Sequence, residues 1–148
     1  MELPPDQKRT DVLLRDDAYE LVLETTTTHH ECFTFTTFDG RQIMLDVTVA
    51  KTLVSEGQTV ACVPLELVDV FAIARNNEWT EDGVDKADPS KPGIAIPMRN
   101  GDQVLYILID GTHRAVRSLR DGSTFSAYLL NDDAARRCYL KGDRSLLP

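Results

Sequence analysis

Cysteine is scarce in this chain: its 148 residues include three cysteines, widely spaced and without a C-x-x-C pair. This argues against a disulfide framework and a structural zinc site, so we expect Cys32, Cys62 and Cys138 to be reduced and mostly buried. Apolar runs are far shorter than a bilayer requires and the N-terminus is polar, which predicts a cytoplasmic protein without a membrane partner. P-loop, Gly-x-Gly-x-x-Gly and Gly-x-Ser-x-Gly motifs are missing as well.

Basic residues are also in deficit. The 16 lysines and arginines face 24 aspartates and glutamates, which leaves a formal net charge of −8. That balance disfavours unaided binding along a nucleic-acid backbone, whereas a local basic patch remains compatible with a small phosphate. Hydrophobic residues make up 42% of the chain. This ordinary globular mixture, at this length, predicts one domain over 1–148 with a real core.

The first half of the chain is typical of a β-meander. We expect residues 1–15 to form a flexible tail and residues 16–62 to form a β-meander extension. Asp39-Gly40 between runs of β-branched and aromatic residues is a strong hairpin signal. The expected elements are strands at Tyr19–Thr25, Cys32–Phe38, Arg41–Val47 and Thr59–Val63, and a helix at Val49–Glu56 capped by Thr48 and ended by Gly57.

The second half alternates between apolar elements and turns. Helical spacing of apolar residues predicts a helix over Leu65–Asn76 that begins near Pro64. The polar segment Asn77–Pro92 is expected to be a long loop, either a binding loop or a disordered excursion, in which Trp79 covers a ligand or packs on the sheet. Strands on either side of Asn100-Gly101 are expected to form a hairpin.

The most informative segment is Val104–Arg120, in which an apolar strand stops at Asp110-Gly111 and a helix begins at once. Free amides in a first helical turn favour an anion, above all a phosphate. Arg114 is suited to bidentate phosphate binding, and His113 to donating to a phosphate oxygen or exchanging a proton. Gly111 and Thr112 offer backbone amides and a hydroxyl, and Asp110 can orient its neighbours or bind Mg²⁺.

A plainer interpretation of the same segment also stands. Asp-Gly is a common turn, and a lone histidine is commonly structural. Arg114, Arg117 and Arg120 fan out over the helix face opposite Ala115, Val116 and Leu119, and such a row can simply be solvated.

The turn Asp110-Gly111-Thr112-His113-Arg114 resembles the ParB/sulfiredoxin-like family, whose members carry a strand, a short turn of this kind and then a helix. The likeness extends from Pro92–Arg99 upstream to Phe125–Leu130 downstream and covers about residues 63–140. It implies an α+β fold, a small mixed sheet with flanking helices preceded by the β-hairpin extension. It also implies that Gly111, Thr112, His113 and Arg114 hold nucleotide phosphates, assisted by Arg117.

The chain departs from the family in ways that bear on function. Sulfiredoxins need a cysteine in the turn, where this chain has Thr112. Chromosome-partition members carry a helix-turn-helix module after the nucleotide domain. We expect the segment that ends at Pro148 to be too short for such a module, so specific DNA binding is disfavoured. Free-serine kinases of the family use an early glutamate, whose nearest positional matches are Glu66 and Asp69.

Two other groups of possible ligands are weaker. His29-His30-Glu31 has metal-ligating residue types, but adjacent histidines in a strand point to opposite faces, and a turn is the simpler interpretation. Glu81, Asp82, Asp85 and Asp88 lack the ligand order of an EF-hand, so we expect them to solvate the loop.

The sequence thus leads to three hypotheses. The first is an enzyme that binds ATP, ADP or CTP, with Mg²⁺ at Asp110, and cleaves or transfers a phosphoryl group with His113, Asp110 and Glu66 as catalytic residues. The second is a non-catalytic, nucleotide-gated or protein-binding adaptor associated with a DNA-handling system. The third is a metal-dependent nuclease, which the acidic balance disfavours. The sequence leaves the oligomeric state open.

Overall fold

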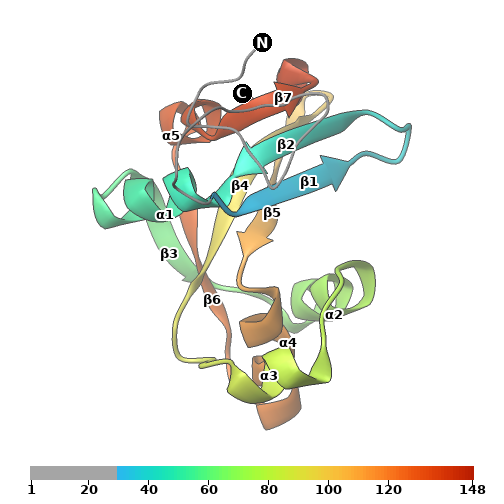
Figure 1. Ribbon diagram of the computed structural model, residues 1–148, viewed down its shortest axis with the longest axis vertical. Coiled ribbons are helices and arrows are strands. Elements are labelled where there is room, and N and C mark those ends of the chain that lie inside the picture. The colour runs from blue at the N-terminus through green and yellow to red at the C-terminus, as the bar shows by residue number, and fades with distance from the viewer. Residues whose placement is uncertain (1–29) are drawn as a thin grey trace.

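The computed structural model describes residues 30–148, which form two small sheets and five α-helices (Figure 1). The α+β expectation is therefore confirmed. The expected tail at 1–15 and the strand at Tyr19–Thr25 lie outside the described residues. No helix within residues 30–148 is long and apolar enough to cross a membrane.

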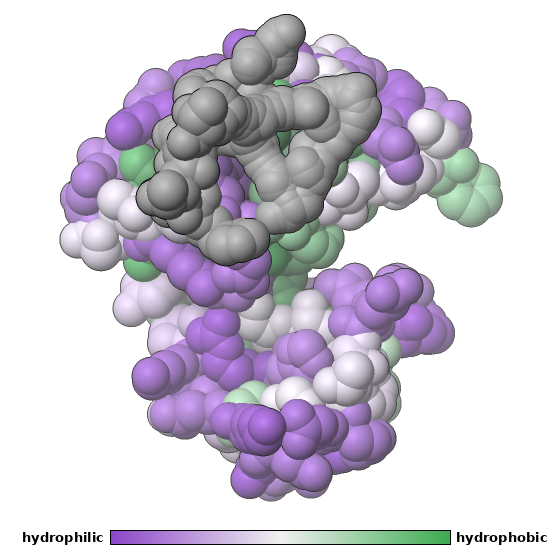
Figure 2. All heavy atoms as spheres, viewed as in Figure 1, coloured by the Kyte–Doolittle hydropathy of each residue, from purple (hydrophilic) through white to green (hydrophobic). Residues whose placement is uncertain are grey.

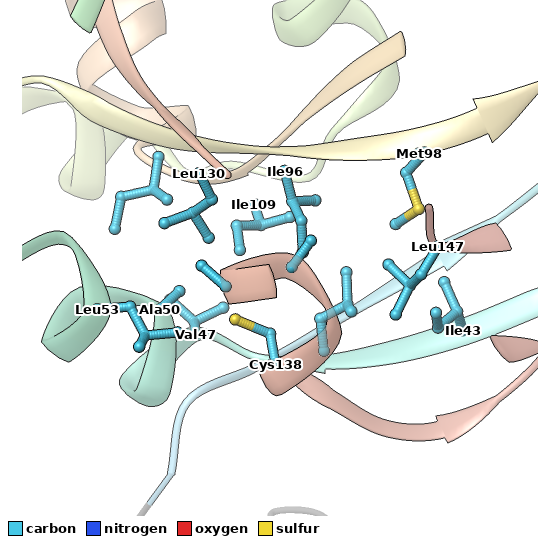
Figure 3. Packing of buried hydrophobic residues seen from close by; sticks show 14 of the residues in the cluster. Ile43, Val47, Ala50, Leu53, Ile96, Met98, Ile109, Leu130, Cys138 and Leu147 are labelled. Atoms are coloured by element: carbon cyan, nitrogen blue, oxygen red, sulfur yellow. The ribbon is translucent and has the colours of Figure 1, made fainter. Parts of the chain in front are cut away.

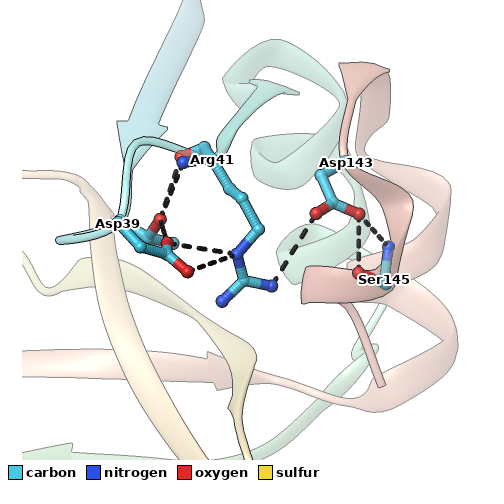
Figure 4. Close-up of polar contacts among 5 residues, drawn as sticks. Asp39, Arg41, Asp143 and Ser145 are labelled. Atoms are coloured by element: carbon cyan, nitrogen blue, oxygen red, sulfur yellow. Dashed lines mark hydrogen bonds and ion pairs between the residues drawn. The ribbon is translucent and has the colours of Figure 1, made fainter.

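The predicted hairpin at Asp39-Gly40 is present. Strands β1 (Cys32–Thr36) and β2 (Gln42–Asp46) pair antiparallel, and β2 also pairs with β7 (Tyr139–Gly142) near the C-terminus. Figure 4 shows Arg41 between Asp39 and Asp143, so that its guanidinium ties the hairpin turn to the C-terminal segment. The backbone and hydroxyl of Ser145 donate to Asp143, which lowers the pKa of that carboxyl.

The second sheet has the order β3-β6-β4-β5. Strand β4 runs parallel to β6 and antiparallel to β5, so the sheet is mixed, and the turn predicted at Asn100-Gly101 joins β4 to β5. Its strands are β3 (Thr59–Pro64), β4 (Gly93–Asn100), β5 (Gln103–Asp110) and β6 (Ser126–Leu130).

The helix predicted at Val49–Glu56 begins earlier than expected. Helix α1 spans Val47–Ser55, and its N-cap is Asp46, whose carboxylate accepts from the Val49 amide at 3.0 Å. Asp46 is buried and also contacts the His30 ring. The prediction that Thr48 caps this helix is wrong, because Asp46 ends β2 at the point where the chain turns into the helix, and a carboxylate there satisfies a free amide.

The prediction of a long loop over Asn77–Pro92 is also wrong in part. It follows α2 (Leu67–Asn76) and contains a short helix, α3 (Glu81–Lys86), whose cap Thr80 accepts from the Gly83 amide at 3.0 Å. Sequence reasoning missed α3 because this helix contains a glycine and few apolar residues. The helical spacing of apolar side chains therefore cannot be recognised in it.

One of the two remaining helices lies where the sequence predicts it, after the Asp110-Gly111 turn, and the other was not predicted. Helix α4 spans Thr112–Asp121 and ends at Gly122 in a left-handed conformation, and α5 (Asp132–Arg137) leads into β7.

One large hydrophobic core joins the two sheets. Figure 3 shows Val47, Ala50 and Leu53 of α1 facing Ile96, Ile109 and Leu130 of the second sheet. This core includes residues from both sides of the expected boundary between 62 and 63. A second, smaller cluster lies between the second sheet, α2 and α4.

The expectation of mostly buried cysteines holds for one of three. Cys138 is buried in the large core, and burial raises the pKa of its thiol to about 12. Cys32 is half-buried and Cys62 is exposed. Cys62 lies on the outward face of β3, where exposed residues alternate with half-buried ones.

Candidate functional site

The turn between β5 and α4 has the backbone geometry expected of a tight strand-to-helix junction. Gly111 is the N-cap of α4 and has φ +109°, a conformation that L side chains rarely adopt. A Cβ at this position would lie 3.0 Å from the Cα of Gly93. The first intrahelical bond runs from the Ala115 amide to the Gly111 carbonyl. The amides of residues 112–114 therefore have no acceptor within the helix.

On one side of this turn, Arg114 is held by two acceptors. Its Nη2 lies 2.9 Å from the Asp110 carboxylate, one helical turn earlier, and its Nη1 donates to the Pro92 carbonyl at 2.7 Å. Both ion-pair partners are mostly covered, with side-chain exposures of 21% for Arg114 and 13% for Asp110. The guanidinium is thus fixed at the end of the sheet rather than free in solvent.

Asp110 and Arg114 line an open pocket of about 400 Å³. Two further cations reach it, Lys51 from α1 and Lys91 from the segment before β4, and Tyr128 of β6 adds a phenol ring. Val54, Pro92 and Ile94 supply an apolar wall. Three cations and one carboxylate line the pocket, and a second carboxylate, Glu31, pairs with Lys51, so a net positive charge remains that suits an anion attached to a flat apolar group.

Sequence reasoning missed Lys51, Lys91 and Tyr128 because they are far from the turn along the chain. A lone lysine on a helix gives no local signal, and only the packing of α1 against the sheet brings it here. Lys51 also pairs with Glu31, with 2.8 Å between Nζ and Oε1, and this hydrogen bond raises the pKa of the lysine. Lys51 therefore remains charged at any working pH.

On the other side of the turn, His113 faces α3. The backbone amide of Thr80 donates to His113 Nε2 at 3.2 Å. The histidine ring packs closely on Gly83, because a Cβ at that position would lie 2.3 Å from Cδ2 of the ring. Asn77 donates to the Thr112 hydroxyl at 3.1 Å. Thr112 and His113 thus contact the segment that joins α2 and α3, and neither of them lines the cationic pocket.

The arginines farther along α4 also contact α3 and its surroundings. Arg117 donates to the Val84 and Asp85 carbonyls, at 3.3 and 2.9 Å, and pairs with Asp121. Arg120 forms a bidentate pair with Glu81, both bonds being 2.7 Å, and stacks over the Trp79 ring. Arg117 and Arg120, two of the three arginines in the row expected on this helix face, therefore hold a neighbouring helix. Figure 2 shows a largely hydrophilic surface at this end of the molecule.

Trp79 does not line the cationic pocket. Its indole Nε1 donates to the Ala74 carbonyl of α2 at 2.8 Å, with Arg120 over its ring. Glu81, expected to solvate a loop, instead holds Arg120, whose hydrogen bonds lower the pKa of the Glu81 carboxyl.

Glu66 does not join the turn residues. It is the N-cap of α2, makes no side-chain capping bond there and is exposed, as is Asp69 in the first turn of the same helix. Their neighbours Leu65 and Leu67 line a different pocket, described below.

Within residues 30–148, no group of three or more His, Cys, Asp or Glu side chains is arranged to hold a metal ion. His30 contacts Asp46, while His29 lies outside the described residues. Asp110 remains the carboxylate closest to the candidate anion pocket, where it would share a metal with a bound phosphate.

Comparisons with protein-family models, with curated proteins and with solved structures give no significant match for this chain.

Proposed function

We propose that the protein binds a nucleoside di- or triphosphate in the pocket between α1, the Lys91-Pro92 segment and the β5–α4 turn. The observation that supports this most is the convergence of Lys51, Lys91 and Arg114 from three separate elements on one open pocket. Arg114 and Lys51 already pair with Asp110 and Glu31, so the fold holds these donors in place, and a phosphate chain would gain charge-assisted hydrogen bonds from them. Tyr128 and the apolar wall then offer a surface for the base.

Each residue has a role in this proposal. Arg114, already oriented by Asp110 and the Pro92 carbonyl, donates to phosphate oxygens. Lys51 and Lys91 neutralise charge along the chain of phosphates, and the free amides at the start of α4 donate to a phosphate oxygen at the turn. Asp110 would be the protein ligand for an Mg²⁺ ion bound together with the phosphates.

The ParB/sulfiredoxin-like resemblance supports the same proposal in part, since the first and last residues of the turn on which it rests, Asp110 and Arg114, line this pocket. Of the hypotheses drawn from the sequence, the nucleotide-gated binding module is the one we put forward. Cleavage or transfer of a phosphoryl group by His113 needs a free ring nitrogen near the phosphate. Nε2 of that ring already accepts the Thr80 amide, on the far side of the turn from Arg114.

Isothermal titration of the full chain with ATP, ADP and CTP, with and without Mg²⁺, tests this proposal. We expect Arg114→Ala to weaken nucleotide binding by at least about tenfold and Lys91→Ala by about threefold, as charge-assisted hydrogen bonds imply. Arg136→Ala is the matched control, because Arg136 carries the same charge and does not line this pocket. Equal affinities of the wild type and Arg114→Ala would remove the proposed site.

Product analysis in the same samples separates binding from catalysis. We expect the nucleotide to remain intact over many hours with Mg²⁺. Release of phosphate that is abolished by His113→Ala would restore the enzymatic hypothesis.

A further inference from the structure

A second pocket lies at the opposite end of α4, and no nucleotide-site residue lines it. Its volume is about 480 Å³, and its walls come from α2, the end of α4 and the segment leading into β6. Leu65, Val70, Leu119 and Phe125 make it apolar, Ser123 and Thr124 add hydroxyls, and none of its lining residues is charged. A neutral, largely apolar group with one polar atom fits such a lining.

The observation that points to an occupant is the hydroxyl of Ser118. Ser118 lines this pocket although its residue is only 1% exposed, and its Oγ has no hydrogen-bond partner within residues 30–148. A buried polar atom without a partner is costly, and most such atoms in native proteins are satisfied by protein, water or ligand. A hydroxyl can both donate and accept, so a phenol that enters the pocket would pair with it.

The rim of the pocket indicates that its occupant belongs to a protein rather than being a free small molecule. Leu67 and Phe71 of α2 line the pocket, yet they are 63% and 53% exposed, and the neighbouring Val68 is 68% exposed. Contiguous exposed apolar side chains on one helix mark an interaction surface larger than a single ring.

Charge further narrows the class of partner. Glu66, the N-cap of α2, and Asp69, in the first turn of that helix, are both exposed. Neither takes part in an ion pair within the described part of the chain. A basic segment would complement both.

We propose that this pocket receives the tyrosine side chain of a basic protein partner, with the phenol hydrogen-bonded to Ser118. Tyrosine combines a large apolar ring with a polar tip, which is the combination common at the centre of interfaces. Lysine or arginine residues on either side of the tyrosine face Glu66 and Asp69. The site is separate from the nucleotide pocket and does not depend on it.

The test uses the full-length, ¹⁵N-labelled protein and a heptapeptide that places one tyrosine among lysines and leucines. We expect amide shifts concentrated in residues 118–125, and binding at least threefold tighter than that of the same peptide with phenylalanine in place of tyrosine. Ser118→Ala should abolish this difference, whereas Ser55→Ala, an exposed control outside the pocket, should preserve it. Equal binding of the two peptides, or absence of shifts at 118–125, would overturn the proposal.

Two further arms separate the alternatives. The double variant Glu66→Gln, Asp69→Asn should weaken the lysine peptide severalfold and leave 4-ethylphenol, a free phenol probe, unaffected. If 4-ethylphenol instead binds as tightly as the peptide and the double variant changes neither affinity, the pocket takes a small neutral phenol and the protein-partner proposal is wrong. Arg114→Ala should not change peptide affinity, so failure of the nucleotide proposal would leave this one standing.

Discussion

The two sides of the β5–α4 turn differ in what covers them. On one side, Thr112 and His113 are engaged by Asn77 and Thr80, and α3 closes over the ring. On the other side, Asp110 and Arg114 hold one another at the wall of an open pocket with two lysines. Residues adjacent in sequence therefore have different surroundings, because successive positions at a helix start point in directions about 100° apart.

This contrast shows how one short motif can pack against a neighbouring segment on one side and line an open pocket on the other. The histidine and the later arginines of α4 attach α3 to the body of the protein, whereas the first arginine is presented to a pocket. A motif that would be interpreted as a single phosphate-binding unit thus divides into a structural half and a half open to a ligand.

Gly111→Ala should disturb the packing on both sides of the β5–α4 turn and should have the largest effect. The new methyl group would be forced into a φ of +109° and lie 3.0 Å from the Gly93 Cα. We expect the free energy of unfolding to fall by about 3 kcal/mol, from backbone strain plus overpacking, as measured by urea denaturation. Gly101→Ala is the control, because Gly101 also has positive φ but a Cβ there meets nothing within 4 Å. Its loss should be about 1 kcal/mol, and equal losses in the two variants would contradict the close packing at Gly111.

Gly83→Ala tests the covered side alone. A Cβ there would lie 2.3 Å from the His113 ring, so the ring or α3 must shift. We expect a loss of about 2 kcal/mol in unfolding free energy and faster amide exchange in α3, with nucleotide affinity nearly unchanged. Asp82→Ala, on the exposed surface of the same helix, is the control. A wild-type exchange rate in Gly83→Ala would show that α3 is not held by this contact.

His113→Ala and Arg114→Ala sharpen the comparison by separating stability from binding. Loss of the histidine ring should cost about 1 kcal/mol of unfolding free energy, because the Thr80 amide loses its acceptor, and should leave nucleotide affinity within about twofold. Arg114→Ala should reduce affinity far more than His113→Ala does. Parallel thermal melts and titrations check this pattern, and a larger affinity loss in His113→Ala would reverse our assignment of the two sides.

The smallest effect concerns pH at the α3–α4 contact. The hydrogen bonds from Arg120 hold the pKa of Glu81 below its ordinary value of 4.5. Since the folded-state pKa is depressed, the contribution of this pair is present above that ordinary value and is lost as pH falls through the folded-state pKa. The pair is exposed, so the stability change should be slight. NMR titration of the Glu81 carboxyl should show its pKa rising in Arg120→Gln, and an unchanged pKa would contradict the bidentate pair.

Much of the fold could be predicted from local patterns. The β1–β2 hairpin follows from Asp39-Gly40 between β-prone runs, and the β5–α4 junction from an apolar run that stops at Asp110-Gly111. Helix α3 could not be found in this way, because it is short and carries a glycine. Its stability comes from contacts with Arg117 and Arg120, which lie more than 30 residues away.

The candidate site was predictable only in part. Arg114 and Asp110 stand out because they lie beside a strand-to-helix turn, whereas Lys51, Lys91 and Tyr128 have no local signature. Ser118 also lacks one, since a serine within a helix looks like any other until the surrounding core shows that its hydroxyl is buried without a partner.

The sequence by itself determined which segments become strands or helices at the turn, because backbone conformation there follows from glycine, apolar run length and capping residues close in the chain. Only the tertiary structure decided which side of the turn is covered and which is open. That choice depends on where α1 and α3 pack, and packing is set by burial of apolar surface across the whole domain rather than by any neighbouring residues.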